Sequence, residues 1–476
     1  MSSLGVLQGD PSSPVLYLIS CHNFRLPPDI DDLTLDGHTI SHLEHADDMV
    51  IISSSFEGLQ RHLDHLTMWC DRNFMTISNT KSKYMIFGMP PDPLPLPILG
   101  GKHILFVNSF TYIGCTFSTT SHNVLAEHYR TKAKTATRVA NTILSMTKHV
   151  GFLPMQEARE LYMGRVDPHL TFGAEVAIDT DKTATAWLEK VQIRFLRRTL
   201  GVQSRCSLAP LFTETGLWPV KYRRLDLALR YLRHILEPSP ALFTRLALQE
   251  CLQLHATHHP SWFGDLVIAL QRLPVPVFLD EVNPTVSSVD SSRQALADSL
   301  MTSLNTAIAE SEKLILLQNR QERDDNGNLI QRTCAVRAHL SIPCHPHRVA
   351  LTRLIFSSHP LAVERLRWVE RRRGIIVRND RIYRLCRLAV EDEAHAVLYC
   401  GGSQYILAAR QSFFDYLTTS HPHIPRCKRW NDSEVDFLRN ILGWPKVLPA
   451  LARLIHVVFA EFEQEPMHIH EDRADA

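Results

Sequence analysis

The sequence lacks an excess of charge of either sign. Its 476 residues carry 51 Lys and Arg against 50 Asp and Glu, which gives a formal net charge of +1. A chain without a general basic field binds nucleic acid only where its cations cluster locally. The sequence also lacks an apolar run long enough to span a bilayer, so we expect no membrane partner.

Two targeting features are missing as well. Residues 1–20 contain neither the positively charged segment nor the apolar segment of a secretory signal. The ten cysteines are scattered along the chain. We therefore expect an intracellular protein, nuclear or cytoplasmic, with reduced thiols. The length corresponds to roughly three domains of ordinary size, and the 45% of hydrophobic residues is enough to build sizeable cores.

The first stretch with chemical character is GVLQGDPSSPVLY at residues 5–17. Gly9-Asp10-Pro11 predicts the start of a helix, with Asp10 as the cap and Pro11 in the first position. The apolar residues that follow predict a buried face; they are Val15, Leu16, Leu18 and Ile19. A glycine before a helix start lets a phosphate approach the backbone, but a capped helix without a ligand is the simpler interpretation.

Two hairpins are predicted next. Asp36-Gly37 in LTLDGHTI is the favoured two-residue turn between short strands. HLEHADDMVIIS predicts a second hairpin with Asp47 and Asp48 at its tip. Adjacent carboxylates suit Mg²⁺, and two such ions hold the attacking and leaving oxygens in phosphoryl transfer. A solvated acidic turn is the alternative interpretation.

More short elements follow up to residue 118. A helix is predicted over about 56–73, with a capping box in Ser54-Ser55-Phe56-Glu57. Residues 75–88 predict a strand, a turn that contains Lys81, and a second strand, and residues 109–118 predict another strand pair.

Taken in order, four of these segments resemble the palm of reverse transcriptases from fungal non-LTR retrotransposons. They are Gln8-Gly9-Asp10-Pro11-Ser12-Ser13-Pro14, His45-Ala46-Asp47-Asp48, Lys81 and Phe110-Thr111-Tyr112-Ile113-Gly114. The resemblance implies that the first segment, with Gln8, Gly9, Asp10, Pro11 and Ser12, lines the pocket for the incoming nucleotide and the RNA template. It also implies that Asp47 and Asp48 bind catalytic Mg²⁺, that Lys81 lies near the triphosphate, and that Tyr112 and Gly114 hold the end of the DNA primer.

The sequence departs from this family at one important place. The family's two-metal site takes a further carboxylate from a strand upstream of the Gln-Gly-Asp-Pro segment, and only seven residues precede Gln8 here. Nothing in the sequence suggests that Asp29, Asp31 or Asp32 replaces that ligand. His45 also stands where the family usually has an aromatic Tyr or Phe. We therefore expect a truncated chain that has lost the ancestral RNA-templated DNA polymerisation.

Basic helices are predicted beyond residue 120. Residues 123–150 form one long helical stretch whose cations Arg130, Lys134 and Arg138 would contact nucleic-acid phosphates from a thumb-like position, or form a solvated face. Residues 187–201 predict a second basic helix, with Gly201 as its C-terminal cap. For the cations of this second helix we prefer the solvated face; they are Lys190, Arg194, Arg197 and Arg198.

The segment 363–400 is rich in arginine. Arg371, Arg372 and Arg373 suit phosphate and Trp368 suits a base, although pairing with the acidic neighbours explains the arginines equally well.

Within the same segment, Cys386, His395 and Cys400 are spaced C-x8-H-x4-C. This spacing resembles the Cys-Cys-His-Cys zinc knuckle of non-LTR elements, but Tyr383 stands where the family has its first cysteine. The Zn²⁺ site is thus one thiolate short. Two free cysteines and a histidine in a small packed hairpin and helix are the alternative.

The predicted fold class is α+β. We expect a partial reverse-transcriptase palm, with an antiparallel sheet and packed helices, over 1–118, and a thumb-like helical region over 119–245. A loop-rich helical connector is predicted over 246–330, an Arg-rich segment with a degenerate zinc knuckle over 331–405, and a helical region over 406–476. Besides the truncated enzyme, a nucleic-acid-binding remnant without catalysis and a host-recruited structural protein remain open.

Overall fold

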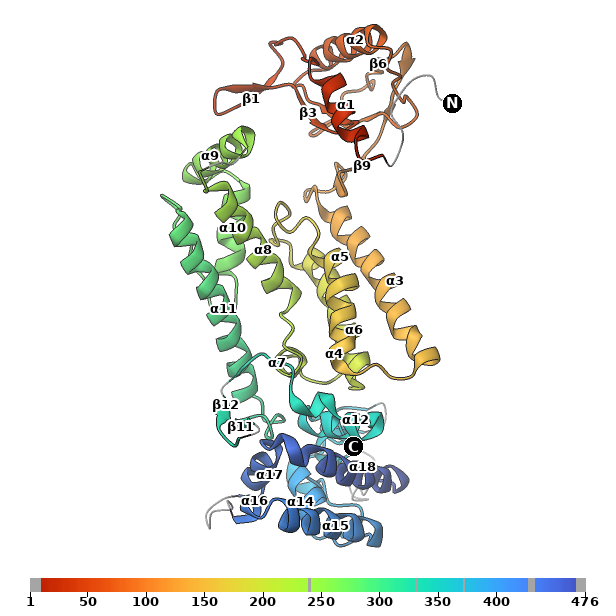
Figure 1. The fold of residues 1–476 in the computed structure, drawn as a ribbon, viewed down its shortest axis with the longest axis vertical. Helices are drawn as coiled ribbons and strands as arrows, with labels where there is room; N and C mark the ends of the chain where they lie inside the picture. The colour runs from red at the N-terminus through yellow and green to blue at the C-terminus, as the bar shows by residue number, and fades with distance from the viewer. Residues whose placement is uncertain are drawn as a thin grey trace.

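Almost all strands lie in the first 118 residues, and the remainder of the chain is mostly helical (Figure 1). The computed structural model describes residues 10–238, 241–324, 326–330, 332–370, 373–426 and 433–467. We call residues 10–118 the N-terminal unit, which forms one end of an elongated molecule. The described residues from 119 onward are the helical body, which forms the middle and the other end. The predicted α+β class is confirmed.

The strands of the N-terminal unit are short. They are β1 (Leu33–Leu35), β2 (His38–Ile40), β3 (His42–His45), β4 (Asp48–Ile51), β5 (Lys83–Tyr84), β6 (Ile98–Leu99), β7 (Lys102–His103), β8 (Leu105–Phe106), β9 (Ser109–Tyr112) and β10 (Cys115–Ser118). The predicted hairpins β1–β2, β3–β4 and β9–β10 are confirmed. Asp36 and Gly37 both take the left-handed conformation, with φ of 47° and 76°, as a two-residue hairpin turn requires.

These strands do not join into one sheet in the described part of the chain. β1–β2, β3–β4, β6–β7 and β9–β10 are separate antiparallel pairs, and β5–β8 is a parallel pair. The single antiparallel palm sheet that the sequence predicts is therefore not present among these residues. Strands of two to four residues offer few ladder hydrogen bonds, and small hairpins are held mainly by what packs on them. Only β5 forms in the stretch for which two strands were predicted.

Helix α1 (Ser13–Cys21) begins later than predicted and is not buried. The carboxylate of Asp10 accepts hydrogen bonds from the backbone N and the hydroxyl of Ser12, so it closes the turn before the helix. The predicted apolar face is between 51% and 62% exposed at Val15, Leu16, Leu18 and Ile19. The helical spacing of these apolar residues predicted that they pack against a core, but no described segment covers them.

Helix α2 (Phe56–Arg72) carries the small core of the N-terminal unit. The Ser55 hydroxyl accepts a hydrogen bond from the Gly58 backbone N–H at 2.9 Å and caps the helix. The predicted capping box of Ser54 with Glu57 is wrong, because the cap lies one residue later and puts Gly58, which has no side chain, in the third helical position. The buried hydrophobic residues of this core are Leu63, Tyr84, Leu99 and Ile104.

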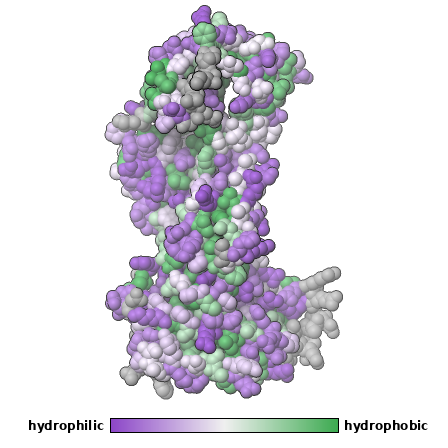
Figure 2. Space-filling model, turned by 45° about the vertical axis from the view of Figure 1, so that its right-hand side comes forward, coloured by the Kyte–Doolittle hydropathy of each residue, from purple (hydrophilic) through white to green (hydrophobic). Residues whose placement is uncertain are grey.

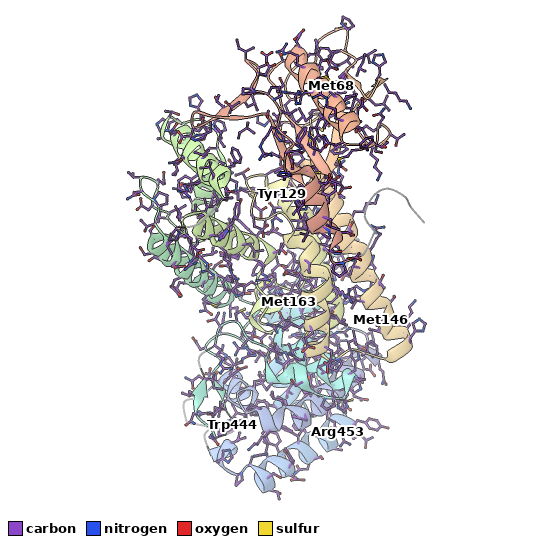
Figure 3. The ribbon with its side chains drawn as sticks, turned by 45° about the horizontal axis from the view of Figure 1, so that its top comes forward. Met68, Tyr129, Met146, Met163, Trp444 and Arg453 are labelled. Atoms are coloured by element: carbon purple, nitrogen blue, oxygen red, sulfur yellow. The ribbon has the colours of Figure 1, made fainter. Side chains whose placement is uncertain are left out.

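The helical body has long helices in its middle part. They are α3 (Ala126–Val150), α4 (Met155–Leu161), a π-helix (Tyr162–Val166), α5 (Asp167–Thr171), α6 (Lys182–Leu200), α7 (Ala209–Thr213), α8 (Val220–Ile235), α9 (Leu242–Ala256), α10 (Trp262–Gln271) and α11 (Val286–Ala309). Tyr129 and Met146 mark the two ends of α3 in Figure 3, and Met163 lies in the neighbouring π-helix. The predicted cap of α6 is confirmed, because Gly201 is left-handed with φ of 68°.

The far end of the body holds shorter elements. They are β11 (Glu322–Arg323), β12 (Leu329–Ile330), α12 (His345–Ile355), α13 (Ala362–Arg365), α14 (Glu393–Leu398), α15 (Gln404–Ser420), α16 (His423–Arg426), α17 (Glu434–Leu442) and α18 (Leu448–Gln464), with 3₁₀ turns at Ala338–Ser341, Arg378–Asp380 and Pro445–Val447. One continuous hydrophobic cluster runs from Tyr129 to Phe462 and joins this end to the middle. No single described helix is long and apolar enough to cross a membrane; α17 and the segment Pro445–Gln464 reach that length only as a pair bent by 94°.

Several ionic groups are buried in the body, and two of them surround Asp179 and Glu214. Arg224 donates to the Asp179 carboxylate at 2.9 and 3.0 Å and to the backbone carbonyls of Leu170 and Ala177. The second group surrounds Glu214, which is 1% exposed and accepts a hydrogen bond from Arg320 at 2.8 Å. Hydrophilic side chains are common on the face that Figure 2 shows. The ionic groups around Asp179 and Glu214, in contrast, are buried.

Candidate nucleic-acid interface and metal centre

The predicted catalytic carboxylates lie at the tip of hairpin β3–β4. Ala46 and Asp47 form the turn, with φ of 53° at Ala46, and Asp48 begins β4 opposite His45. Both aspartates are exposed. The hairpin thus presents two neighbouring carboxylates to solvent.

Two tyrosines from other segments lie near these carboxylates. Burial and a hydrogen bond with Cys21 raise the pKa of Tyr17 in α1, and the negative charge of Asp47 adds to the rise. Burial raises the pKa of Tyr112 in β9, and the charge of Asp48 adds to it. Tyr17 of α1 and Tyr112 of β9 are therefore close enough to the tip of hairpin β3–β4 to experience the charge of its carboxylates.

The other residues predicted for the nucleotide are less closely tied to this point. Lys81 is exposed in the turn before β5, and no hydrogen bond or ion pair joins it to either aspartate in the described residues. Asp10, Pro11 and Ser12 are exposed ahead of α1. Gln8 and Gly9 lie outside the described residues. The roles of these residues stay predictions.

Two carboxylates do not fit a two-metal site by themselves. No third His, Cys, Asp or Glu side chain joins Asp47 and Asp48 in a group compact enough to hold an ion, within the ranges that the structure describes. Two-metal phosphoryl transfer needs ligands for both ions in fixed positions. The donor set of this hairpin is therefore incomplete.

The three aspartates of the segment LPPDIDDL form ion pairs with side chains of helix α2. Arg61 contacts Asp29 at 2.5 Å and Asp31 at 2.7 Å, and its hydrogen bonds lower the pKa of Asp29. Asp32 contacts His62 at 2.6 Å. These contacts agree with the expectation that none of the three replaces the family's upstream ligand.

The tip of hairpin β9–β10 rests on the helical body. Ile113 and Gly114 form its turn with φ of 46° and 76°. A Cβ atom on Gly114 would lie 2.6 Å from the ring of Phe172, so both the turn and the close approach require glycine here. A cavity of about 500 Å³ opens beside this contact, next to the ion pair between Asp167 and Arg223. Docking explains Gly114 without a primer, and the predicted primer contact of Tyr112 and Gly114 stays a prediction.

Helices α3 and α6 run side by side and form a groove of about 380 Å³ (Figure 1). Arg130 and Lys134 line it from α3, as predicted for phosphate contacts. Arg138 is exposed on the same helix but does not line the groove. The remaining lining residues are Ala133, Thr137, Trp187, Lys190, Val191 and Arg194.

Sequence reasoning missed the part that α6 takes in this groove. It favoured a solvated face for Lys190 and Arg194, but the structure places both across from the cations of α3. The spacing of Trp187, Lys190 and Arg194 puts them on one face of a helix, and this was the available signal. Which helix that face meets is a tertiary property, which one helix's sequence does not contain.

Several arginines of the C-terminal Arg-rich segment have partners within the fold, whereas Arg365, Arg378 and Arg387 are exposed. Arg373 donates to the carbonyls of Leu366, Gly374 and Arg365 and pairs with Glu370 at 3.4 Å. Arg371 and Arg372 lie outside the described residues. The phosphate contacts of all three stay predictions.

Other members of the same Arg-rich segment also have partners within the chain. Trp368 lies under the guanidinium of Arg205, at 5.3 Å, and donates to Glu364. The Arg384 guanidinium pairs with the buried carboxylate of Glu391 at 2.6 Å. These contacts favour acidic pairing and packing as the explanation for this segment.

Cys386, His395 and Cys400 come together as the spacing predicted. Their ligand atoms all lie within 4.8 Å of one another, and Cys386 Sγ is 3.5 Å from His395 Nε2. His395 is held by α14, whose cap Asp392 accepts a hydrogen bond from its backbone N–H. Cys400 is fully buried and accepts one from the Gly402 N–H at 3.4 Å.

Tyr383 lies next to these three side chains. Its ring is 0% exposed and packs edge-on against His395 and Phe462, with centroid distances of 4.6 and 5.0 Å. Its hydroxyl lies beside Cys400 without a hydrogen bond of normal geometry. Burial raises the pKa of Tyr383 and of Cys400 and lowers that of His395. The centre offers two thiols and one imidazole, three of the four ligands of a structural zinc site.

A comparison with protein families agrees with the N-terminal signature. Residues 1–117 match the family model described as reverse transcriptase (RNA-dependent DNA polymerase). The match covers 117 of 476 residues and ends in β10. The sequence matches no curated protein. The N-terminal unit is therefore similar to reverse transcriptases, a family that normally uses Mg²⁺ and binds a template and a primer.

Proposed function

We propose that this chain descends from the reverse transcriptase of a fungal non-LTR retrotransposon, a transposable element, and no longer synthesises DNA on RNA. The observation that carries this proposal is the hairpin β3–β4. It lies within the family match and presents Asp47 and Asp48, but no third carboxylate stands with them among the described residues. A nucleotidyltransferase of this class needs two ions clamped around the reacting phosphate.

The same carboxylates retain a limited capacity for Mg²⁺. The ion prefers hard oxygen ligands and keeps several waters, so Asp47 and Asp48 would hold it weakly. An ion held by two exposed side chains is poorly positioned, and a displacement of about 1 Å at a reacting centre costs roughly a hundredfold in rate. Binding of the metal without synthesis is therefore the expected behaviour.

A second function, nucleic-acid binding without chemistry, is supported by the groove between α3 and α6. Four cations line it, and no acidic side chain does so in the described part of the chain. Such a site binds phosphates whether or not the hairpin carboxylates work. RNA and DNA are then partners of the protein, which we place inside the cell.

Zn²⁺ belongs to the same proposal as a structural ion. The donor set of Cys386, His395 and Cys400 fits Zn²⁺ better than Mg²⁺, because thiolates are soft ligands. A water or Tyr383 would have to complete it. Elemental analysis of the purified chain should give one zinc per chain, lost in Cys400→Ser. A metal-free wild type would favour two free cysteines.

The experiment that tests the main proposal is primer extension on an RNA template with Mg²⁺. The full chain and its Asp47→Asn/Asp48→Asn variant should both give no product, while both bind nucleic acid, tested with the RNA template and with an RNA–DNA duplex, with a salt-dependent affinity. Extension by the wild type that the variant lacks would contradict the proposal. A chain that neither extends nor binds would instead be a structural protein that kept only the fold.

A further inference from the structure

The groove between α3 and α6 has cations on both walls. Arg130 and Lys134 stand on α3, and Lys190 and Arg194 stand on α6. All four are exposed. On each helix the two cations are four residues apart, which corresponds to about 6 Å along the axis. Positive charges therefore recur along the length of the groove, and a polyanion can contact them with successive phosphates.

The positive charge of the groove is not balanced by facing carboxylates. Among the described residues, the carboxylate paired with a lining cation is that of Glu127, which contacts Arg130 at 3.3 Å at an exposed site. Glu189 follows Trp187 closely in the sequence, but it is on another side of α6. Burial raises the pKa of Glu189, and Lys221 of α8 opposes that rise. An anion in the groove would relieve the repulsion among its cations.

Trp187 supplies an aromatic face at the same place. Its ring is half-buried in the groove, and the Arg130 guanidinium lies over it at 5.2 Å from the centroid. The guanidinium is a flat group that already stacks on this face, so a base could take its place on the ring or stack on the guanidinium itself. Bases stack on tryptophan and on arginine in the same manner, and cations that follow a backbone beside such a ring are typical of single-strand binding.

The aromatic ring beside the cations favours a single strand over a duplex. A duplex keeps its bases stacked inside, away from Trp187, whereas a single strand can turn one base outward.

We propose that the groove between α3 and α6 binds single-stranded nucleic acid, with phosphates on Arg130, Lys134, Lys190 and Arg194 and one base stacked at Trp187. The inference rests on the nucleic-acid binding proposed above and adds its substrate class and its position. It assigns a direct role to α6, for which sequence reasoning preferred a solvated face.

The test compares full-length variants with labelled oligo(U) and oligo(dT) of about 12 nucleotides, within the site sizes known for such grooves, and with a duplex hairpin. Lys190→Gln/Arg194→Gln should weaken single-strand binding at least tenfold. It should also reduce the slope of log Kd against log salt by about 1.4, or about 0.7 for each lost phosphate contact. The control Lys102→Gln/Arg245→Gln removes the same charge from exposed sites outside the groove and should bind as the wild type does.

Trp187→Leu separates stacking from charge. It should weaken binding about tenfold with an unchanged salt slope, and Trp187→Phe should restore most of the affinity. Thermal unfolding of each variant identifies any that is misfolded. If Trp187→Leu is misfolded, the affinity of Trp187→Phe for the single strand tests whether an aromatic ring at this position binds a base.

Wild-type affinity in both the Lys190/Arg194 and the Trp187 variants would overturn the groove assignment and leave nucleic-acid binding intact. Equal binding and equal loss for the duplex would overturn the single-strand inference. A wild type that binds none of the probes would overturn the proposed nucleic-acid binding itself.

Discussion

The N-terminal unit and the helical body are built on very different cores. Four buried hydrophobic residues form the core of the unit, around helix α2. In the body, one cluster continues from Tyr129 to Phe462 through almost every helix. Yet the family match covers the unit and stops at residue 117. The part of the molecule that matches the family model is thus the part with the smaller hydrophobic core.

Element length explains much of this difference. The unit has strands of two to four residues in separate pairs, whereas α3 in the body has 25 residues. A two-stranded hairpin is marginal alone, and long helices bury a whole apolar stripe against their neighbours. We therefore expect the body to unfold at a higher denaturant concentration than the unit.

The largest expected effect comes from the buried ionic group of the body. Arg224→Met leaves the Asp179 carboxylate buried without its partner and should lower the free energy of unfolding by about 3–5 kcal/mol. Urea unfolding followed by circular dichroism measures it. Arg230→Met is the control, because Arg230 is half-exposed and its buried partner Asp226 keeps a second partner in Arg293, so we expect a loss of less than about 1 kcal/mol. Equal losses in the two variants would contradict the role given to the buried pair.

Matched leucines probe the two cores directly. Leu63→Ala in α2 should cost about 2–5 kcal/mol and act on the N-terminal unit alone, because its cavity lies in the small core. Leu188→Ala in α6 should cost a similar amount but act on the body. Hydrogen exchange resolved by segment distinguishes them. A common loss of protection over both regions in either variant would show that the two cores unfold together.

The pH dependence of stability should come from the body through His339. Burial, with the charge of Arg320, lowers the pKa of His339 to about 3, although Glu214 is 3.8 Å away. Because the folded pKa lies below the ordinary 6.5, the unfolded chain binds the proton first, and stability falls as the pH drops below about 6.5. His339→Gln should reduce this loss by up to about 1.4 kcal/mol per pH unit. Exposed His149→Gln serves as the control, and equal slopes in both variants would refute the assignment.

The smallest effect concerns two helix caps of the same kind. Ser55→Ala removes the cap of α2 and Asp181→Ala that of α6, and each should cost about 1 kcal/mol. The loss at Ser55 should be the larger fraction of its region's stability, and it should be visible as faster proteolysis within residues 10–118. Equal proteolysis of the two variants would remove the contrast between the regions.

Local signals in the sequence were sufficient for the local structure. The Asp36-Gly37 turn and the left-handed Gly201 each depend on a few neighbouring residues, and both form as predicted. The cap of α2 is also local, but it lies at Ser55, one residue after the predicted capping serine. The spacing of Cys386, His395 and Cys400 was enough to bring them together.

Features that depend on the packing of two distant segments could not be predicted from the sequence. The apolar stripe on α1 predicted burial, but periodicity does not say whether another segment covers the stripe. The groove needs the relative rotation of α3 and α6, which their separate sequences do not fix. Asp47 and Asp48 were placed correctly at a hairpin tip, but their neighbours Tyr17 and Tyr112 belong to segments far apart in the chain.

The side chain at position 383 couples core packing to metal coordination. A phenol ring fills the interior between His395 and Phe462, where it adds volume but no sulfur ligand. A Tyr383→Cys change would supply a third thiol beside Cys386 and Cys400, but it would leave a void as large as the lost ring. A stronger zinc site at this position would therefore need a second substitution that refills the core.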